Sequence, residues 1–151
     1  MMNWILLVLA AIASLVMAML VGGLLVPARV EISRSLDLAT PPEDVWRLIH
    51  AVEQIPHWCP ALPTLIVTDA AAPDRLALRL VGDSQEVVGD WKVLVEVHEG
   101  RTRLTVFESS VTSNPLLRFL RNFGGRTTRV DRLLRATATQ LGEPGATPRD
   151  R

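Results

Sequence analysis

The chain has 151 residues and a formal net charge of zero at pH 7. This length accommodates one domain of ordinary size and leaves little room for a second. Because the chain is not net basic and has few aromatic side chains to stack on bases, we expect no nucleic-acid partner. The single cysteine, Cys59, excludes an internal disulfide.

The first part of the chain is strongly apolar. The run that begins at Trp4 and ends at Val26 contains no charged side chain. A helix of this length spans about 35 Å at ~1.5 Å per residue, enough for a hydrocarbon core of ~30 Å. Trp4 suits a membrane interface, and Arg29 follows the run. We therefore predict a transmembrane anchor helix over residues 1–27 that contacts the lipid bilayer.

A cleaved secretory signal is the alternative interpretation of this segment. Signal peptides have a basic n-region and an h-region of ~7–15 residues. Here no Lys or Arg precedes the run, and the run is longer than such an h-region. Both features favour a retained, single-pass membrane anchor. The nearest basic residues, Arg29 and Arg34, follow the run, which predicts that the domain lies on the cytoplasmic side.

An α+β domain is predicted over residues 28–143. Residues 30–38 alternate between apolar and polar side chains, the pattern of a strand with one buried face. Arg34 falls on that apolar face. A helix is expected to follow, with Thr40 as its capping residue and Glu43 completing a capping box.

After a short helix over residues 51–58, the pattern returns to strands. Apolar and β-branched residues form four runs bounded by turn residues, at 62–68, 75–81, 86–97 and 102–112. Glu99-Gly100 between the last two runs predicts a tight hairpin. The domain is therefore expected to contain five strands.

The C-terminal part predicts a long amphipathic helix. It opens at Asn114, continues to about Leu141, and is expected to be weakened or bent at Gly124-Gly125. Its arginines fall opposite the apolar stripe, where they meet solvent or anionic lipid headgroups. The polar tail over residues 144–151 is predicted to be disordered.

The order of these elements is distinctive, and so are the residues at each landmark. The landmarks are residues 30–38, 41–46, 55–60, Trp91 with 101–104, 114–120 and 130–134. Together they resemble the SRPBCC superfamily of START-like and polyketide cyclase/dehydrase-type domains over about residues 29–143. The resemblance implies a helix-grip fold, in which a curved antiparallel sheet wraps the long C-terminal helix and leaves an apolar cavity. The family usually has seven strands, so five imply a short sheet or a long run that divides in two.

Four side chains are candidate ligand-binding residues. Glu108 and Arg34 both continue the inward phase of their strands, and a buried charge must be paired or neutralised. We hypothesise that they pair with each other or act as polar anchors in an apolar pocket. The alternative is that one or both lie at a strand end in solvent. Trp58 and Trp91 either line the mouth of the pocket or pack in the core.

These features predict a membrane-anchored domain that binds a hydrophobic small molecule or lipid between the sheet and the C-terminal helix. Two alternatives remain. The first is a cyclase- or dehydratase-like enzyme using Glu108 or His57 as general acid or base. The second is a non-catalytic, membrane-tethered interaction protein with a filled cavity. No cofactor and no catalytic residue are assigned, and the spacing of His50, His57 and Cys59 fits no metal site. Nothing in the sequence specifies an oligomeric state.

Overall fold

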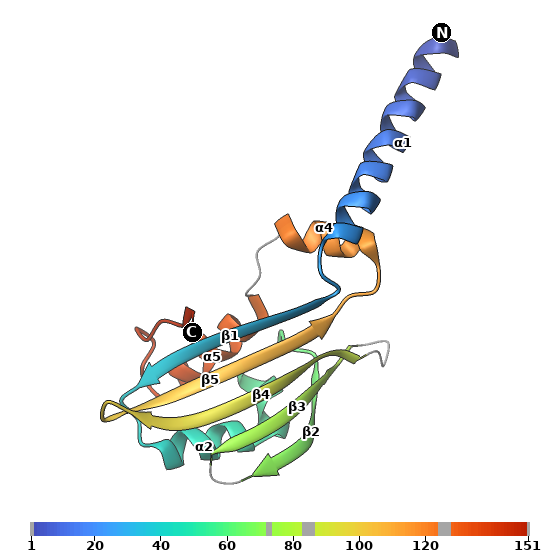
Figure 1. Cartoon of the computed structure of the whole chain (residues 1–151). Coiled ribbons are helices and arrows are strands. Elements are labelled where there is room, and N and C mark those ends of the chain that lie inside the picture. The colour runs from blue at the N-terminus through green and yellow to red at the C-terminus, as the bar shows by residue number, and fades with distance from the viewer. Residues whose placement is uncertain (1, 72–73, 83–86, 124–127, 151) are drawn as a thin grey trace. The chain divides into compact units, whose positions relative to one another are not determined.

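The chain forms two compact units in the computed structural model, which describes residues 2–71, 74–82, 87–123 and 128–150 (Figure 1). One, the helical unit, contains α1 (Met2–Leu25) and α4 (Pro115–Phe123). The other, the sheet unit, contains the strands and the remaining helices. The sequence placed α4 in the α+β domain, but α4 clusters with α1 instead.

The sheet unit is built on a six-stranded sheet in the order β2-β3-β4-β5-β1-β6. Its strands are β1 (Arg29–Leu38), β2 (Thr64–Ala71), β3 (Arg75–Val81), β4 (Val87–His98), β5 (Arg101–Val111) and β6 (Arg149–Asp150). All five predicted strands are present. The predicted hairpin joins β4 to β5, and Glu99 and Gly100 at its tip have φ values of 51° and 76°. Positive φ at both central residues is the geometry of a tight two-residue hairpin turn.

Helices cover one face of this sheet (Figure 1). They are α2 (Pro42–His50), the short 3₁₀ turn η1 (Val52–Gln54), α3 (Ile55–Trp58) and α5 (Thr128–Gln140). Along the strands, every second side chain is apolar and faces the helices. These side chains pack against the apolar stripes of α2 and α5 in one core. The core includes Leu36, Leu78, Trp91, Val93, Leu104, Val45, Ile49, Leu133 and Leu134. The predicted α+β helix-grip fold is therefore confirmed, with α5 as the gripped helix.

The C-terminal part differs from the prediction in two ways. The segment predicted as one long helix contains α4 and α5, and the bend expected at Gly124-Gly125 lies outside the described residues. The tail predicted to be disordered forms β6, in which Arg149 and Asp150 pair with Ser35 and Arg34 of β1. The polar composition of the tail suggested disorder. Composition contains no information about the edge of β1, with which the backbone of the tail pairs.

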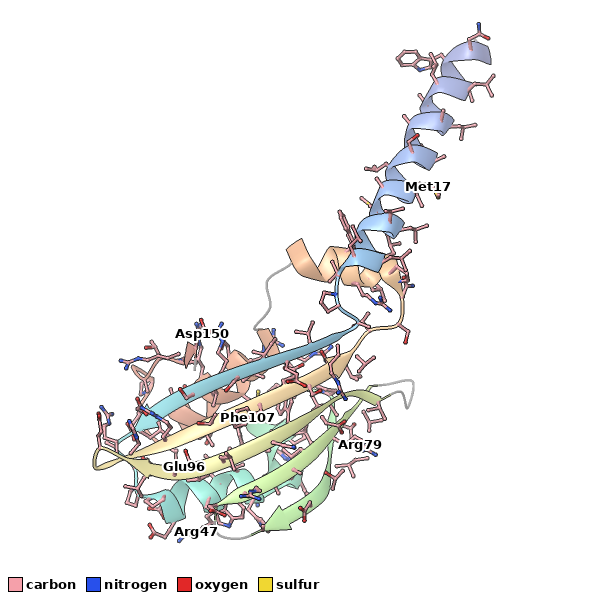
Figure 2. The ribbon with its side chains drawn as sticks, in the orientation of Figure 1. Met17, Arg47, Arg79, Glu96, Phe107 and Asp150 are labelled. Atoms are coloured by element: carbon pink, nitrogen blue, oxygen red, sulfur yellow. The ribbon has the colours of Figure 1, made fainter. Side chains whose placement is uncertain are left out.

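In the helical unit, α1 contains one stretch, Asn3–Leu25, that is long and apolar enough to cross a membrane. None of its most apolar window is buried, and its side chains, such as Met17, project outward (Figure 2). A signal sequence passes the same test of length and apolar composition. The predicted helix start at Asn114 is confirmed, because its Oδ1 accepts a hydrogen bond from the Leu116 N–H at 2.9 Å.

Candidate functional site

The candidate site is the inner face of the sheet, which packs against the helices. Trp91 in β4 lies directly opposite Glu108 in β5. Residues that face each other across an antiparallel pair project from the same side of the sheet. Trp91 has 0% of its surface exposed, and Glu108 is half-buried. The inward phase predicted for Glu108 therefore agrees with the structure.

Burial decreases along the inner face toward this end of the sheet. On β5 the side chains of Leu104 and Val106 are fully buried, whereas Glu108 is half-buried. On β1, Leu36 is fully buried and Ile32 only half-buried. The interior is therefore closed at the Leu36 end and partly accessible at the Ile32 end.

Two tryptophans bring polar groups into this core. The indole Nε1–H groups of Trp58 and Trp91 are both buried and have no hydrogen-bond acceptor among the described residues. Trp58 ends α3 and is half-buried against the same core as Trp91. A buried donor without a partner costs about 1–3 kcal/mol, and a buried tryptophan N–H usually finds an acceptor. Both indoles are thus suited to donate to an acceptor that enters the interior.

Arg34 forms ion pairs with residues of other elements than predicted. Its Nη1 lies 2.8 Å from Oδ1 of Asp150 in β6, and its Nε lies 3.6 Å from Oδ1 of Asp131 in α5. The second separation is that of an ion pair without a hydrogen bond. The hypothesised Arg34–Glu108 pair is therefore not formed. Arg34 instead joins β1 to α5 and β6, and its link to Asp150 was hidden because the tail was predicted to be disordered.

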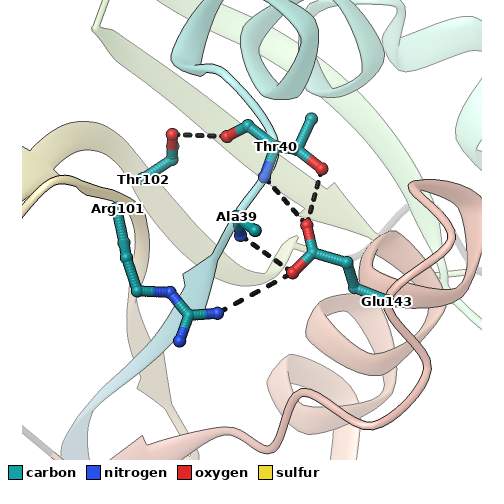
Figure 3. A network of polar contacts seen from close by, with 5 residues as sticks. All are labelled: Ala39, Thr40, Arg101, Thr102 and Glu143. Atoms are coloured by element: carbon teal, nitrogen blue, oxygen red, sulfur yellow. Dashed lines mark hydrogen bonds and ion pairs between the residues drawn. The ribbon is translucent and has the colours of Figure 1, made fainter.

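A polar network that the sequence analysis missed joins Glu143, three residues after the end of α5, to the segment between β1 and α2 (Figure 3). Glu143 accepts hydrogen bonds from the N–H of Ala39 at 2.8 Å and from the N–H and hydroxyl of Thr40 at 2.9 and 2.6 Å. The guanidinium of Arg101 lies 3.9 Å from the same carboxylate. Thr102 donates its hydroxyl to the carbonyl of Thr40 at 2.6 Å. The network fixes the chain at the closed end of the interior.

This network explains why the predicted capping box is wrong. The N-cap of α2 is Pro41, and no side chain caps the helix. The hydroxyl of Thr40 donates to Glu143 instead, and Glu43 is exposed. A contact between residues 103 positions apart leaves no local signal in the sequence.

Replacing Glu143 with glutamine is expected to destabilise the sheet unit in a pH-dependent way. Burial opposes ionisation of Glu143, but the hydrogen bonds from Ala39 and Thr40 and the charge of Arg101 outweigh it, so its pKa lies below the usual value. Its contribution is therefore fully present above the unfolded-state pKa of ~4.3 and is lost as the pH falls through the lower folded-state value. We expect a loss of about 1–3 kcal/mol in the free energy of unfolding at neutral pH.

The measurement is urea unfolding of the full chain in detergent, followed by tryptophan emission at neutral and acidic pH. Glu53→Gln, at an exposed position, is the matched control and is expected to have little effect. An equal cost of Glu143→Gln at both pH values would contradict the role of the carboxylate.

Three clefts open at the surface of the described part of the sheet unit. The first, about 510 Å³, lies beside the network and is lined by Asp37, Arg101 and Glu143 among others. The other two, about 330 and 500 Å³, share Lys92 and Phe107, and the smaller one is also lined by Ile32 and Glu108. None of the three is lined by α5. Beneath α5 the core side chains, such as Trp91, Leu133 and Leu134, are fully buried.

Comparisons with known proteins concern the fold. No family model matches the sequence, and no curated protein matches it. The similar solved structures include the following three, each given with the share of this chain and then of the other chain that the alignment covers. A conserved protein from Geobacillus kaustophilus has a TM-score of 0.56 at 13% identity, and the alignment covers 79% of this chain and 99% of that protein. The protein TTHA0849 from Thermus thermophilus has 0.54 at 16% identity, covering 74% and 97%. Protein Ms6760 from Mycobacterium smegmatis has 0.53 at 13% identity, covering 74% and 90%. At such identities the likeness shows a shared fold alone.

Proposed function

We propose that the protein is a membrane-anchored, SRPBCC-type domain that binds a hydrophobic small molecule or lipid at the Trp91–Glu108 end of its interior. The observation that carries this proposal is the fully buried Trp91, whose indole N–H has no acceptor among the described residues. A carbonyl, ether or hydroxyl oxygen of a mostly apolar molecule matches that donor. Binding sites for small molecules combine apolar walls with a few such polar groups.

The partly open end of the interior supports this location. Ile32 and Glu108 are the half-buried residues there, next to the buried Trp91. An apolar chain that displaces water from this end gains about 0.8 kcal/mol per CH₂ group. Shape and apolar contact therefore supply affinity, while the indole selects a ligand with an acceptor.

The apolar helix α1 supplies the second part of the proposal. None of its most apolar window is buried in the described structure, and lipid is the solvent in which such a surface is stable. A bilayer also holds the apolar molecules that the domain is proposed to bind. Basic residues follow α1, and this charge bias supports a location of the sheet unit on the cytoplasmic side.

Native mass spectrometry of the full chain, gently extracted from membranes, tests the proposal. We expect the wild-type chain to carry a bound apolar molecule. Trp91→Phe keeps an aromatic ring but removes the N–H donor, so its occupancy is expected to decrease. Trp46→Phe is the matched control, because Trp46 packs beside His50 in α2 and is expected to leave occupancy unchanged. Equal occupancy in the Trp91→Phe variant would exclude Trp91 as the anchor.

A second candidate function is a membrane-tethered interaction protein without a small-molecule ligand. The packing favours it, because Trp91, Leu133 and Leu134 are all fully buried in one core beneath α5. Under this alternative the wild-type chain shows its unmodified mass alone, and the exposed surfaces of the sheet unit serve partner binding.

A further inference from the structure

The helical unit contains a second amphipathic element, α4, which lies across the end of α1 (Figure 1). A Cβ atom at Gly23 would overlap with the backbone carbonyl of Pro115. A Cβ atom at Gly22 would lie 2.9 Å from the ring of Phe119. Small residues permit this close approach of two helices. The two glycines of α1 therefore form the surface against which α4 packs.

The beginning of α4 is also held by its own residues. The Oδ1 of Asn114 caps the helix, and the guanidinium of Arg118 donates to the carbonyls of Thr112 and Ser113 at 2.6 and 3.0 Å. In addition, the N–H of Thr112 donates to the carbonyl of Ala28 at 2.9 Å, which ties this segment to the residues after α1. The position of α4 on α1 is thus specified by several contacts within one unit.

Two large apolar side chains of α4 are left exposed by this packing. Leu117 is 54% exposed and Leu120 is 50% exposed. They belong to the same unit as α1, whose apolar surface requires lipid under the proposed function. A helix with an apolar face and a basic, polar remainder is typical of elements that lie in the membrane interface.

The charge of the helical unit points to the same partner. Residues 1–29 and 111–126 contain no Asp or Glu, and their charged side chains are Arg29, Arg118, Arg121 and Arg126. All the acidic residues of the chain belong to the sheet unit. A helical unit whose sequence contains four arginines and no acidic residue is attracted to anionic lipid headgroups.

We infer that α4 is an interfacial helix that lies in the headgroup region of an anionic bilayer, with Leu117 and Leu120 directed toward the acyl chains. This inference rests on the proposed insertion of α1, and it adds a second lipid contact with a preference for anionic lipid. The exposed leucines are assigned to lipid and not to a protein partner.

Site-directed spin labelling of the full chain in vesicles tests this inference. The background variant is Cys59→Ser, and single labels are attached through Leu15→Cys in α1, Leu120→Cys in α4 and Glu96→Cys in β4. Collision of each label with oxygen, which concentrates in the bilayer, is compared with collision with the neutral, water-soluble complex NiEDDA. We expect the oxygen-to-NiEDDA ratio to be highest at position 15, lowest at position 96 and intermediate at position 120.

Failure of the inference and failure of the anchor give different results. A high ratio at position 15 with an aqueous value at position 120 would overturn the interfacial role of α4 and leave the anchor intact. Aqueous values at both positions would overturn the anchor and the inference together. In vesicles without any other protein, an aqueous value at position 120 is also the result expected if Leu117 and Leu120 bind a protein partner.

The preference for anionic lipid has its own readout. Changing the vesicles from phosphatidylcholine to a mixture with phosphatidylglycerol is expected to raise the ratio at position 120. Arg121→Gln is expected to reduce this rise, whereas Arg135→Gln, which removes the same charge from α5, is expected to leave it unchanged. A ratio that does not respond to phosphatidylglycerol would overturn the assignment to anionic lipid.

Discussion

Replacing Ile12 and Val16 with arginine is expected to remove the chain from the membrane fraction. Both side chains lie near the middle of α1 and are exposed. An arginine at the centre of a membrane helix costs about 2.5–3.5 kcal/mol, so two oppose insertion by roughly 5–7 kcal/mol. Alkaline extraction of membranes from cells that express the tagged full chain measures the effect. The wild-type chain should stay in the pellet and the double variant in the supernatant.

The matched control places the same charges on the sheet unit. Ile66 and Val67 are exposed on the edge strand β2, and their replacement by arginine should leave membrane retention unchanged. Retention of the Ile12→Arg/Val16→Arg chain after alkaline extraction would contradict a spanning role for α1. A mature wild-type chain that lacks α1, detected by its intact mass, would instead identify the helix as a signal sequence.

Trp91→Ala is expected to have the largest effect on the stability of the sheet unit. Trp91 is the largest fully buried side chain among the described residues and packs in the core between the strands and the helices. Truncation of a buried tryptophan leaves a cavity, and such changes cost about 3–5 kcal/mol. Urea unfolding of the full chain in detergent, followed by the emission of the remaining tryptophans, measures the loss.

Val97→Ala provides the control for this prediction. Val97 lies on the same strand, β4, but is 69% exposed, so its truncation is expected to change the free energy of unfolding by less than about 0.5 kcal/mol. A similarly small loss for Trp91→Ala would mean that the core tolerates a void at this position. The role of Trp91 as a central core residue would then be incorrect.

The strands could be predicted from the sequence because their signal is local. Apolar residues at every second position of β4 and β5 face the core, and Glu99-Gly100 marks the turn between them. The inward phase of Glu108 followed from the same alternation, and its position opposite Trp91 agrees with it. Period and turn chemistry therefore define the sheet and one wall of the candidate site.

The partners of the predicted elements could not be derived in the same way. An apolar stripe indicates that a helix packs on something, without indicating on what. For this reason α4 and α5 looked like one helix, although α4 packs against the glycines of α1 and α5 against the sheet.

The charged side chains show the same limitation. Arg34 was expected to meet Glu108, but Asp131 and Asp150 are its partners. Thr40 was expected to cap α2, but it donates to Glu143. These partners lie far away along the chain, and one of them belongs to a tail whose polar composition suggested disorder.

The nuclear magnetic resonance signal of the Trp91 indole N–H tests the central claim most directly. The full chain is labelled with ¹⁵N-tryptophan, and single Trp→Phe variants assign its four indole signals. Removal of bound lipid by extensive detergent exchange is expected to shift the Trp91 signal upfield as its hydrogen bond is lost, and returning the extracted lipid is expected to restore it. An indole signal that stays the same with and without lipid, or that exchanges magnetisation only with water, would contradict a ligand at this end of the interior.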